Sequence, residues 1–184
     1  MKTKLIIAST AALLSLGGCF STHYYVLSTA SSPEQSFQQS QISIGIEKVL
    51  LPEYLAKRDI AVASTNNSIT FLSDSWAESL EDGLSQRLVS FMQKKFNQPN
   101  VHLYPWGVDK QPDRKVRLAI SRFISKGGYV YLEGNWEVEN MHTKKHISKL
   151  FSIVLESSDD TEGIVASMDQ AFAQLEESIS KKIR

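Results

Sequence analysis

Few side chains in this sequence are of the types that carry chemistry, and their spacing argues against a catalytic or metal site. The histidines are His23, His102, His142 and His146. His142-x3-His146 would present both rings on one face only in a helix, whereas this stretch is typical of a turn entering a strand. Glu133 and Glu137 lie four residues apart in a strand pattern, about 13 Å at ~3.3 Å per residue, too far for the usual acid–base pair. The sequence also has no phosphate loop and no Gly-x-Ser-x-Gly motif, so we expect no enzymatic activity and no bound metal.

The single cysteine, Cys19, has the clearest chemical role. It follows Leu16-Gly17-Gly18, an apolar run over residues 5–16, and a start that carries Lys2 and Lys4. A charged start and a short apolar run are typical of a secretory signal, and the run is too short to span a bilayer. The small residues before Cys19 resemble the lipobox of bacterial lipoproteins. This resemblance implies that residues 1–18 are removed and that the thiol receives a diacylglycerol. An ordinary secreted protein with a spare thiol is the alternative.

An acylated Cys19 would tie the protein to a membrane through its only modification, a diacylglycerol with an N-linked acyl chain. Two or three acyl chains hold firmly where one holds marginally. Residues 19–23 then form a short tether, which keeps the first structured residues within about 15 Å of the headgroups at 3.3–3.6 Å per residue. Phe20 stands where an aspartate would resemble the inner-membrane retention signal. By that resemblance we expect the periplasmic face of the outer membrane.

Length and composition predict one globular domain over residues 24–184. The chain of 184 residues has 42% hydrophobic and 22% charged residues, which are ordinary values for a globular protein. Basic and acidic side chains number 20 each, and Lys2 and Lys4 leave with the signal, so the mature charge is about −2. This near-neutral balance argues against nucleic acid as a partner.

Period-2 patterns predict several strands. Apolar and polar residues alternate or gather in short runs, separated by turn signals at Pro52, Asn66-Asn67 and Gly127-Gly128. The expected strands cover 24–27, 42–50, 59–63, 68–72, 101–104, 115–120, 129–138 and 147–155. The last two follow residues 115–120 as a meander, and we expect 147–155 to lie inside the sheet because it is strongly apolar.

Two amphipathic helices complete the predicted fold. A capping box, Ser75-x-x-Glu78, opens the first, and Asn97 with Pro99 ends it. The second opens at residues 159–162, with acid at its start and base at its end. Its apolar stripe is Ile164, Met168, Phe172, Leu175 and Ile179. We expect an α/β protein, with α+β possible: a mixed, largely antiparallel sheet of about six strands whose faces are covered by the two long helices.

Two loops offer candidate partner-binding residues. Leu51, Pro52, Tyr54 and Leu55 lie between two strands, where apolar residues either pack into the core or face a partner. Trp106 lies in a Pro-Gly loop, with the same two interpretations open. Tyr129 and Tyr131 share the outward register of their strand, although a helix on that face would bury them.

Three short blocks resemble the ABC-type transport auxiliary lipoprotein family, which is PqiC-like. They are Tyr24-Tyr25-Val26-Leu27, residues 44–49 followed by Leu51-Pro52-Glu53-Tyr54-Leu55, and Trp76-Ala77-Glu78-Ser79-Leu80. The resemblance spans nearly all of the mature chain. The sequence lacks the proline that the family usually has in each of the last two blocks, which affects the expected loop geometry.

The resemblance implies a non-catalytic auxiliary subunit of an intermembrane lipid transport system. Such a lipoprotein would dock a periplasm-spanning protein with MCE domains at the outer membrane, and it could form a homo-oligomer. The alternative is a periplasmic lipid carrier with an apolar pocket between helix and sheet, suggested by the many Leu, Ile, Phe and Met residues on both helices.

Overall fold

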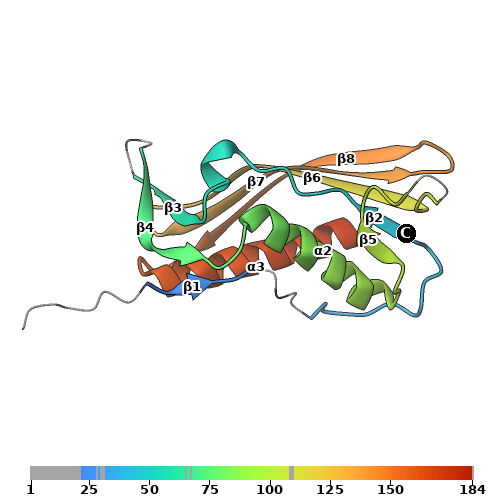
Figure 1. The fold of residues 1–184 in the computed structure, drawn as a ribbon, viewed down its shortest axis with the longest axis horizontal. Helices are drawn as coiled ribbons and strands as arrows, with labels where there is room; N and C mark the ends of the chain where they lie inside the picture. Colours follow the sequence, from blue (N-terminus) through green and yellow to red (C-terminus); the bar gives the residue numbers. More distant parts are fainter. Residues whose placement is uncertain are drawn as a thin grey trace, which may run out of the picture.

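Three long strands of alternating sequence form the centre of the fold. The computed structural model describes residues 22–27, 29, 32–64, 66, 68–107 and 110–183, so the predicted signal and Cys19 lie outside the described residues. Strands β6 (Arg114–Lys126), β7 (Tyr129–Asn140) and β8 (His146–Glu156) form an antiparallel meander (Figure 1). Gly127 and Gly128 both have positive φ at the β6–β7 turn, a conformation that glycine adopts without strain.

The predicted alternation of β6 and β7 is confirmed. Val116 lies opposite Val138 and Leu118 opposite Trp136, and all four side chains are buried. Gly134 interrupts the apolar series because a Cβ there would lie 2.2 Å from the carbonyl oxygen of Ala119 and 2.9 Å from the Phe151 ring. The glycine is therefore required by the close approach of its neighbours.

Strand β8 is an edge strand, so its expected position inside the sheet is wrong. It pairs only with β7 in the described part of the sheet. Ile147, Leu150 and Val154 are exposed, Leu150 to 88%. The apolar composition suggested a central strand, but a strand of this kind also forms when only one register faces the core.

The remaining strands build a mixed sheet of eight strands in the described residues, more than the expected six. Strand β2 (Ile44–Ile46) runs parallel to both β6 and β5 (Val101–Leu103). Strand β3 (Asp59–Ala63) pairs antiparallel with β4 (Ile69–Trp76), as the hairpin pattern predicted. Strand β1 (Tyr24–Tyr25) adds to β4 in parallel. A short 3-10 turn, η2 (Glu53–Leu55), connects the β2 and β3 regions.

Helix α2 (Leu80–Phe96) begins later than the predicted capping box. Ser75 and Trp76 belong to β4, where they pair with Tyr24 and Tyr25. Ser79 is the N-cap, and its side chain accepts a hydrogen bond from the Asp82 amide. The sequence pattern missed this boundary because pairing with β1 extends β4, and that partner lies about 50 residues away in the chain. The predicted end at Asn97, which has a left-handed conformation, is confirmed.

Helix α3 (Thr161–Ser180) follows the prediction closely. The Asp160 carboxylate accepts a hydrogen bond from the Gly163 amide at 2.7 Å. The whole predicted stripe is buried, and Phe172, Leu175 and Ile179 are fully buried. None of the described helices is long and apolar enough to cross a bilayer.

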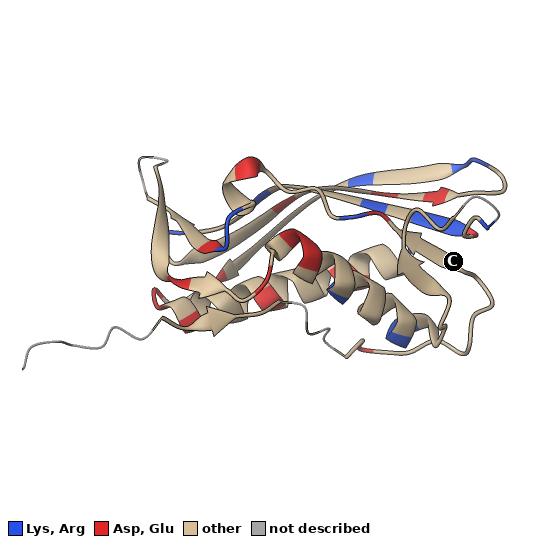
Figure 2. Ribbon diagram, in the orientation of Figure 1, with Lys and Arg blue, Asp and Glu red and all other residues tan. Residues whose placement is uncertain are grey.

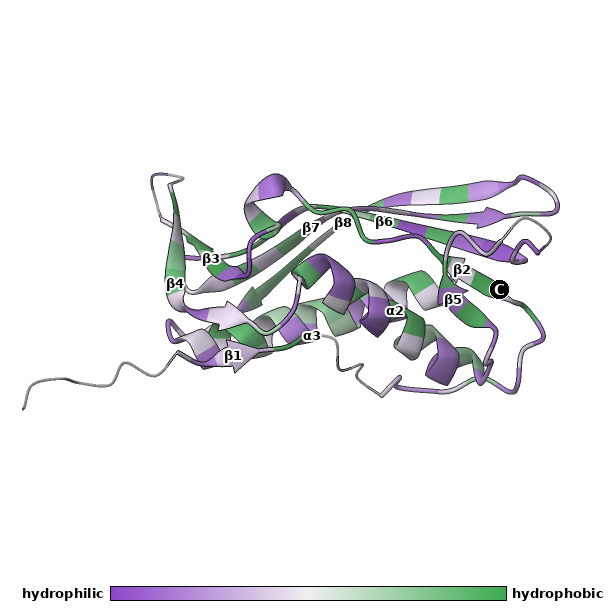
Figure 3. Ribbon diagram, viewed as in Figure 1, coloured by the Kyte–Doolittle hydropathy of each residue, from purple (hydrophilic) through white to green (hydrophobic). Residues whose placement is uncertain are grey.

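Both helices lie on the same side of the β6–β7–β8 meander (Figure 1). The expectation that helices cover both sheet faces is therefore wrong, since no α-helix of the described residues lies on the other face, which we call the open face. Figure 3 shows the consequence in the colouring, since hydrophobic residues concentrate between the helices and the sheet. Tyr129, from the outward register, is 41% exposed.

A buried ion pair connects the two helices. Arg87 of α2 and Glu176 of α3 have fully buried side chains, and their Nε and Oε2 atoms lie 3.2 Å apart. The Arg87 guanidinium also donates to the carboxylate and the carbonyl of Asp169 and to the carbonyl of Leu27. It lies 5.3 Å from the centre of the Phe172 ring. Arg87 thus joins α2, α3 and the segment after β1.

We expect Arg87→Met to lower the free energy of unfolding by about 3–5 kcal/mol, because it removes the cation that is paired with the buried Glu176 carboxylate. Adding Glu176→Met should restore most of that loss, since the buried carboxylate is then gone as well. The control is Lys48→Met, which removes an ion pair with Glu81 and Asp82 whose lysine is half exposed and should cost less than about 1 kcal/mol. Urea unfolding measures all three, and equal losses in the two single variants would contradict the proposed role of burial.

Candidate partner-binding surface

The predicted loop from Leu51 to Leu55 folds back on itself as one short turn. Pro52 is extended, and its carbonyl accepts a hydrogen bond from the Leu55 amide at 2.9 Å. Leu55 is only 3% exposed and belongs to the core, so its side chain supports the turn and is not available to a partner. Leu51 and Pro52 are half-buried.

Tyr54 fills a gap in the hydrogen bonding of β6. Strand β6 pairs with the segment around Leu50 up to Ile120. Its next pairing on that side is with β3, at Ser125. Between these points the Tyr54 hydroxyl accepts a hydrogen bond from the Phe123 amide at 3.4 Å. Burial raises the pKa of this phenol, consistent with a packed position. Tyr54 therefore has a structural role in addition to any contact with a partner.

Leu50 is an exposed residue that the sequence reasoning missed. Its backbone bridges Ala119 on β6, and its side chain is 54% exposed. Ala119 alternates with the buried Leu118 and Ile120, so this position faces the open side of the sheet. Residue 50 looked like part of a core strand in the sequence, and only the pairing with β6 fixes its direction.

Ion pairs lie on β6 and its neighbours in the stretch before Ala119, and Figure 2 shows residues of both charges on these strands. Arg117 Nε donates to the Glu47 carboxylate at 2.7 Å, and this bond lowers the pKa of Glu47. Lys115 lies 2.9 Å from Glu139, and their hydrogen bond raises the lysine pKa. In these pairs each positive side chain lies beside a negative one, so the pairs add little net charge to the open face.

A shallow cavity of about 450 Å³ adjoins the η2 turn. Tyr54, Ile69, Arg122 and Glu133 are among its lining residues. Arg122 stacks 3.9 Å from the centre of the Tyr131 ring and lies 3.6 Å from the Glu133 carboxylate. The cavity opens to the outside of the sheet and lies away from the core between helices and sheet.

Trp106 does not join this surface. It follows β5, at the end of the molecule opposite β1 and β4 (Figure 1). The indole Nε1 donates to the His102 carbonyl at 3.4 Å, and the two rings meet edge to face at 5.5 Å. The structure thus brings Leu51, Pro52 and Tyr54 together and leaves Trp106 at a separate place.

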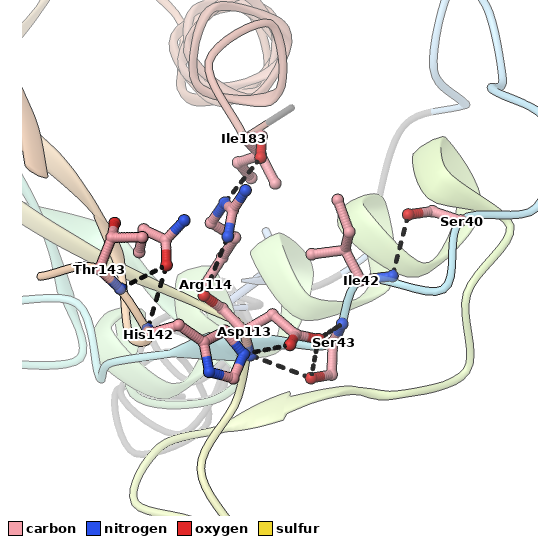
Figure 4. A network of polar contacts seen from close by, with 9 residues as sticks. Ser40, Ile42, Ser43, Asp113, Arg114, His142, Thr143 and Ile183 are labelled. Carbon is pink, nitrogen blue, oxygen red and sulfur yellow. Dashed lines mark hydrogen bonds and ion pairs between the residues drawn. The ribbon is translucent and has the colours of Figure 1, made fainter. Parts of the chain in front are cut away.

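Ser43, Asp113 and His142 form a polar network at this far end (Figure 4). The Asp113 carboxylate accepts hydrogen bonds from the Ser43 amide and hydroxyl, both at 2.7 Å, and contacts His142 Nε2 at 2.7 Å. A hydrolytic triad has its histidine between the serine and the acid, whereas here the carboxylate lies in the middle. The network instead joins the starts of β2 and β6 to the β7–β8 turn. The hydrogen bond with His142 contributes most to lowering the pKa of Asp113 to about 2.

Among the described residues, no group of three or more His, Cys, Asp or Glu side chains is arranged to hold a metal ion.

Comparisons with known proteins identify the family of this chain and find solved structures with a similar fold. The family model described as ABC-type transport auxiliary lipoprotein component matches residues 25–180. The chain belongs to this family. The match confirms the resemblance seen in the sequence, and it identifies the protein as an auxiliary component of transport systems in a lipoprotein family.

Solved structures share the fold at low sequence identity. One, a protein of uncharacterised function, is 20% identical with a TM-score of 0.71, over 89% of this chain and 99% of its own. Another, from Xanthomonas campestris, is 18% identical with a TM-score of 0.71, over 85% of this chain and 92% of its own. No curated protein sequence matches.

We expect the Asp113 network to stabilise the protein in a pH-dependent way. The folded pKa of about 2 lies below the ordinary 3.8, so the contribution is complete above about pH 4 and is lost as pH falls towards 2. Asp113→Asn should lower the free energy of unfolding by about 1 kcal/mol at pH 7, after allowance for the partial exposure of the carboxylate. Urea unfolding between pH 7 and pH 2.5 measures the gap from wild type, with the exposed Glu53→Gln as control. A gap that stays constant over this range would contradict the assignment.

Proposed function

We propose that this protein is a lipid-anchored docking subunit of an intermembrane lipid transport system, and that its partner is a periplasm-spanning protein with MCE domains. The observation that supports this most is the family match over residues 25–180, which makes the chain an auxiliary transport component. The lipobox at Cys19 and the open sheet face fit that role, since a docking subunit needs an attachment to the membrane and a free surface for its partner.

The proposed anchor is an acylated Cys19 in the outer membrane, with the domain on the periplasmic side. His23 is already fixed to the fold, because its amide donates to the Asp74 carboxylate at 3.0 Å and its carbonyl accepts from Ser75. Only four residue steps separate Cys19 from His23, about 14 Å at full extension. The domain is thus confined close to the bilayer.

The proposed docking surface is centred on Leu50, on the open face of the sheet, and continues into the turn at Leu51 and Pro52. Leu50 is more than half exposed and Pro52 is partly exposed, whereas Leu51 packs partly against the core. Two residues fix the turn to the rest of the fold. The Tyr54 hydroxyl accepts the hydrogen bond from the Phe123 amide, and the Leu55 side chain is buried in the core. An apolar centre with charged side chains around it has the composition of a specific protein interface.

The carrier alternative remains a prediction, but no particular contact favours it. In the described part of the fold, fully buried side chains such as Trp136, Phe172 and Leu175 fill the space between α3 and the sheet. A carrier would need an apolar pocket of several hundred cubic ångströms.

We expect cells fed a palmitate analogue to label the wild-type protein and not Cys19→Ser, because the thiol is the acceptor of the lipid. The serine variant should also stay unprocessed at residue 18 and so keep its signal. Label on the serine variant, or retention of a processed form at the envelope, would show that another feature anchors the protein.

We expect Leu50→Asp to weaken capture of a purified MCE-domain partner at least tenfold, since a carboxylate would be buried at the centre of the interface. The matched control is Ile147→Asp on β8, where the native side chain is 46% exposed and lies away from the η2 turn. Equilibrium binding and the unfolding midpoint are measured for both. Equal affinity of a folded Leu50→Asp protein and the wild type would remove this surface from the interface.

A further inference from the structure

The β1–β4 end of the domain carries exposed apolar side chains that the proposed docking surface does not include. Tyr24 is 68% exposed on β1, and Ile69 and Phe71 are 39% and 41% exposed on β4. Figure 3 shows the hydrophobic stretch along β4 at the end of the molecule where β1 lies. Apolar residues on such a short edge need either a covering partner or a surface into which they can dip.

Cationic side chains accompany these residues. Lys57 Nζ lies 4.9 Å from the centre of the Phe71 ring. Arg58 is also exposed, and its carbonyl accepts a hydrogen bond from the Trp76 amide at the end of β4. Aromatic rings beside Lys and Arg are the composition of surfaces that lie at the headgroup level of a bilayer, where the long cationic side chains reach the phosphates.

The position of the chain start decides between the possible occupants of this surface. The backbone of His23 and Tyr25 is hydrogen-bonded to Ser75 and Ala77 at the end of β4. The end of β4 at Ser75 is bonded to His23, which lies within about 14 Å of the lipid attachment point if Cys19 is acylated. Phe71 lies four residues before Ser75, about 13 Å back along β4 at ~3.3 Å per residue. The bilayer is therefore the surface that this end of the domain meets first.

Acidic residues at the same end of the domain would influence how the domain tilts on an anionic bilayer. Asp160 and Glu162 lie at the start of α3, and Asp74 is hydrogen-bonded to the tether at His23. Together with burial, which is the largest cause, these carboxylates raise the pKa of Tyr25. Figure 2 shows the acidic residues at the α3 start and cationic residues on the segment leading into β3. An anionic leaflet would repel the first group and attract the second.

We propose that Tyr24, Ile69 and Phe71, with Lys57 and Arg58, form a membrane-contact surface that binds the headgroup region of an anionic phospholipid bilayer. This contact fixes the tilt of the domain on the bilayer. The inference rests on the proposed anchoring at Cys19, and it adds a second, non-covalent contact to it.

The acylated full-length mature protein, reconstituted into phosphatidylethanolamine–phosphatidylglycerol vesicles, tests this contact. Acylation of Cys19 leaves an introduced cysteine as the only thiol, so Phe71→Cys can be labelled with an environment-sensitive fluorophore. Leu150→Cys, which is also exposed but lies on β8, is the matched control. We expect a blue-shifted emission and quenching by lipid-borne quenchers at position 71 and neither at position 150. Water-like emission at both positions, in protein that floats with the vesicles and unfolds normally, overturns the proposal and leaves the anchor intact.

A second measurement does not depend on acylation. Mature Cys19→Ser protein, which starts at residue 19 and so lacks both the signal and the lipid, is mixed with the same vesicles, and its binding is compared with and without Lys57→Gln and Arg58→Gln. We expect each substitution to weaken binding about fivefold, whereas Lys149→Gln on β8 should change nothing. Equal binding of all variants overturns the cationic contribution. If the acylated wild type fails to float, the proposed anchor is wrong, and this measurement still decides the membrane contact.

Discussion

Coverage of the sheet by helices on one face only is the constraint on which the rest of this structure depends. Helix α3 packs its buried stripe against β7, and α2 packs beside it, so β6 and β7 each have one register that is largely buried and one that faces outwards. The buried register contains Val116, Leu118 and Trp136. The outward register carries paired charges instead, such as Arg117 with Glu47. A second helical layer would have had to bury those charges at a large cost.

The two helices are themselves held in register by a buried polar contact. Arg87 reaches from α2 to Glu176 and Asp169 on α3, and to the carbonyl of Leu27 after β1. Apolar packing alone tolerates small shifts of one helix along another, whereas a buried guanidinium requires its partners at fixed positions. The same contact ties the chain after β1 to the helices. In this way it helps to position the end of the domain that we propose meets the membrane.

The proposed membrane and docking surfaces are neighbours, since Ile69 of β4 and Tyr54 of the η2 turn line the same cavity. The β1–β4 end is tied to His23 and so to the predicted anchor, whereas Leu50 and the η2 turn lie on the open sheet face. Trp106 and the Asp113 network lie at the far end. A subunit that is attached at one end and open on one face can hold a second protein at a defined angle to the bilayer. The role that we propose for it is positioning, which needs no reactive group.

The sequence by itself determined the features that depend on neighbours in the chain. Short-range periodicity predicted the β3–β4 hairpin, the β6–β7–β8 meander, the N-terminus of α3 and its buried stripe, because hairpin turns and helix caps are local interactions. The lipobox residues up to Cys19 are likewise a local signal, and the family followed from three short blocks. The chemistry expected at Cys19 lies outside the described residues and stays a prediction.

The tertiary structure decided what depends on distant partners. Pairing of Ser75 with Tyr24 moved the start of α2, and the lack of a second neighbour made β8 an edge despite its apolar composition. The exposure of Leu50 follows from its bridge to Ala119, and the burial of Leu55 from the η2 turn, neither of which the sequence pattern could show. Periodicity tells how many faces an element has, but which face is covered is a property of the whole chain.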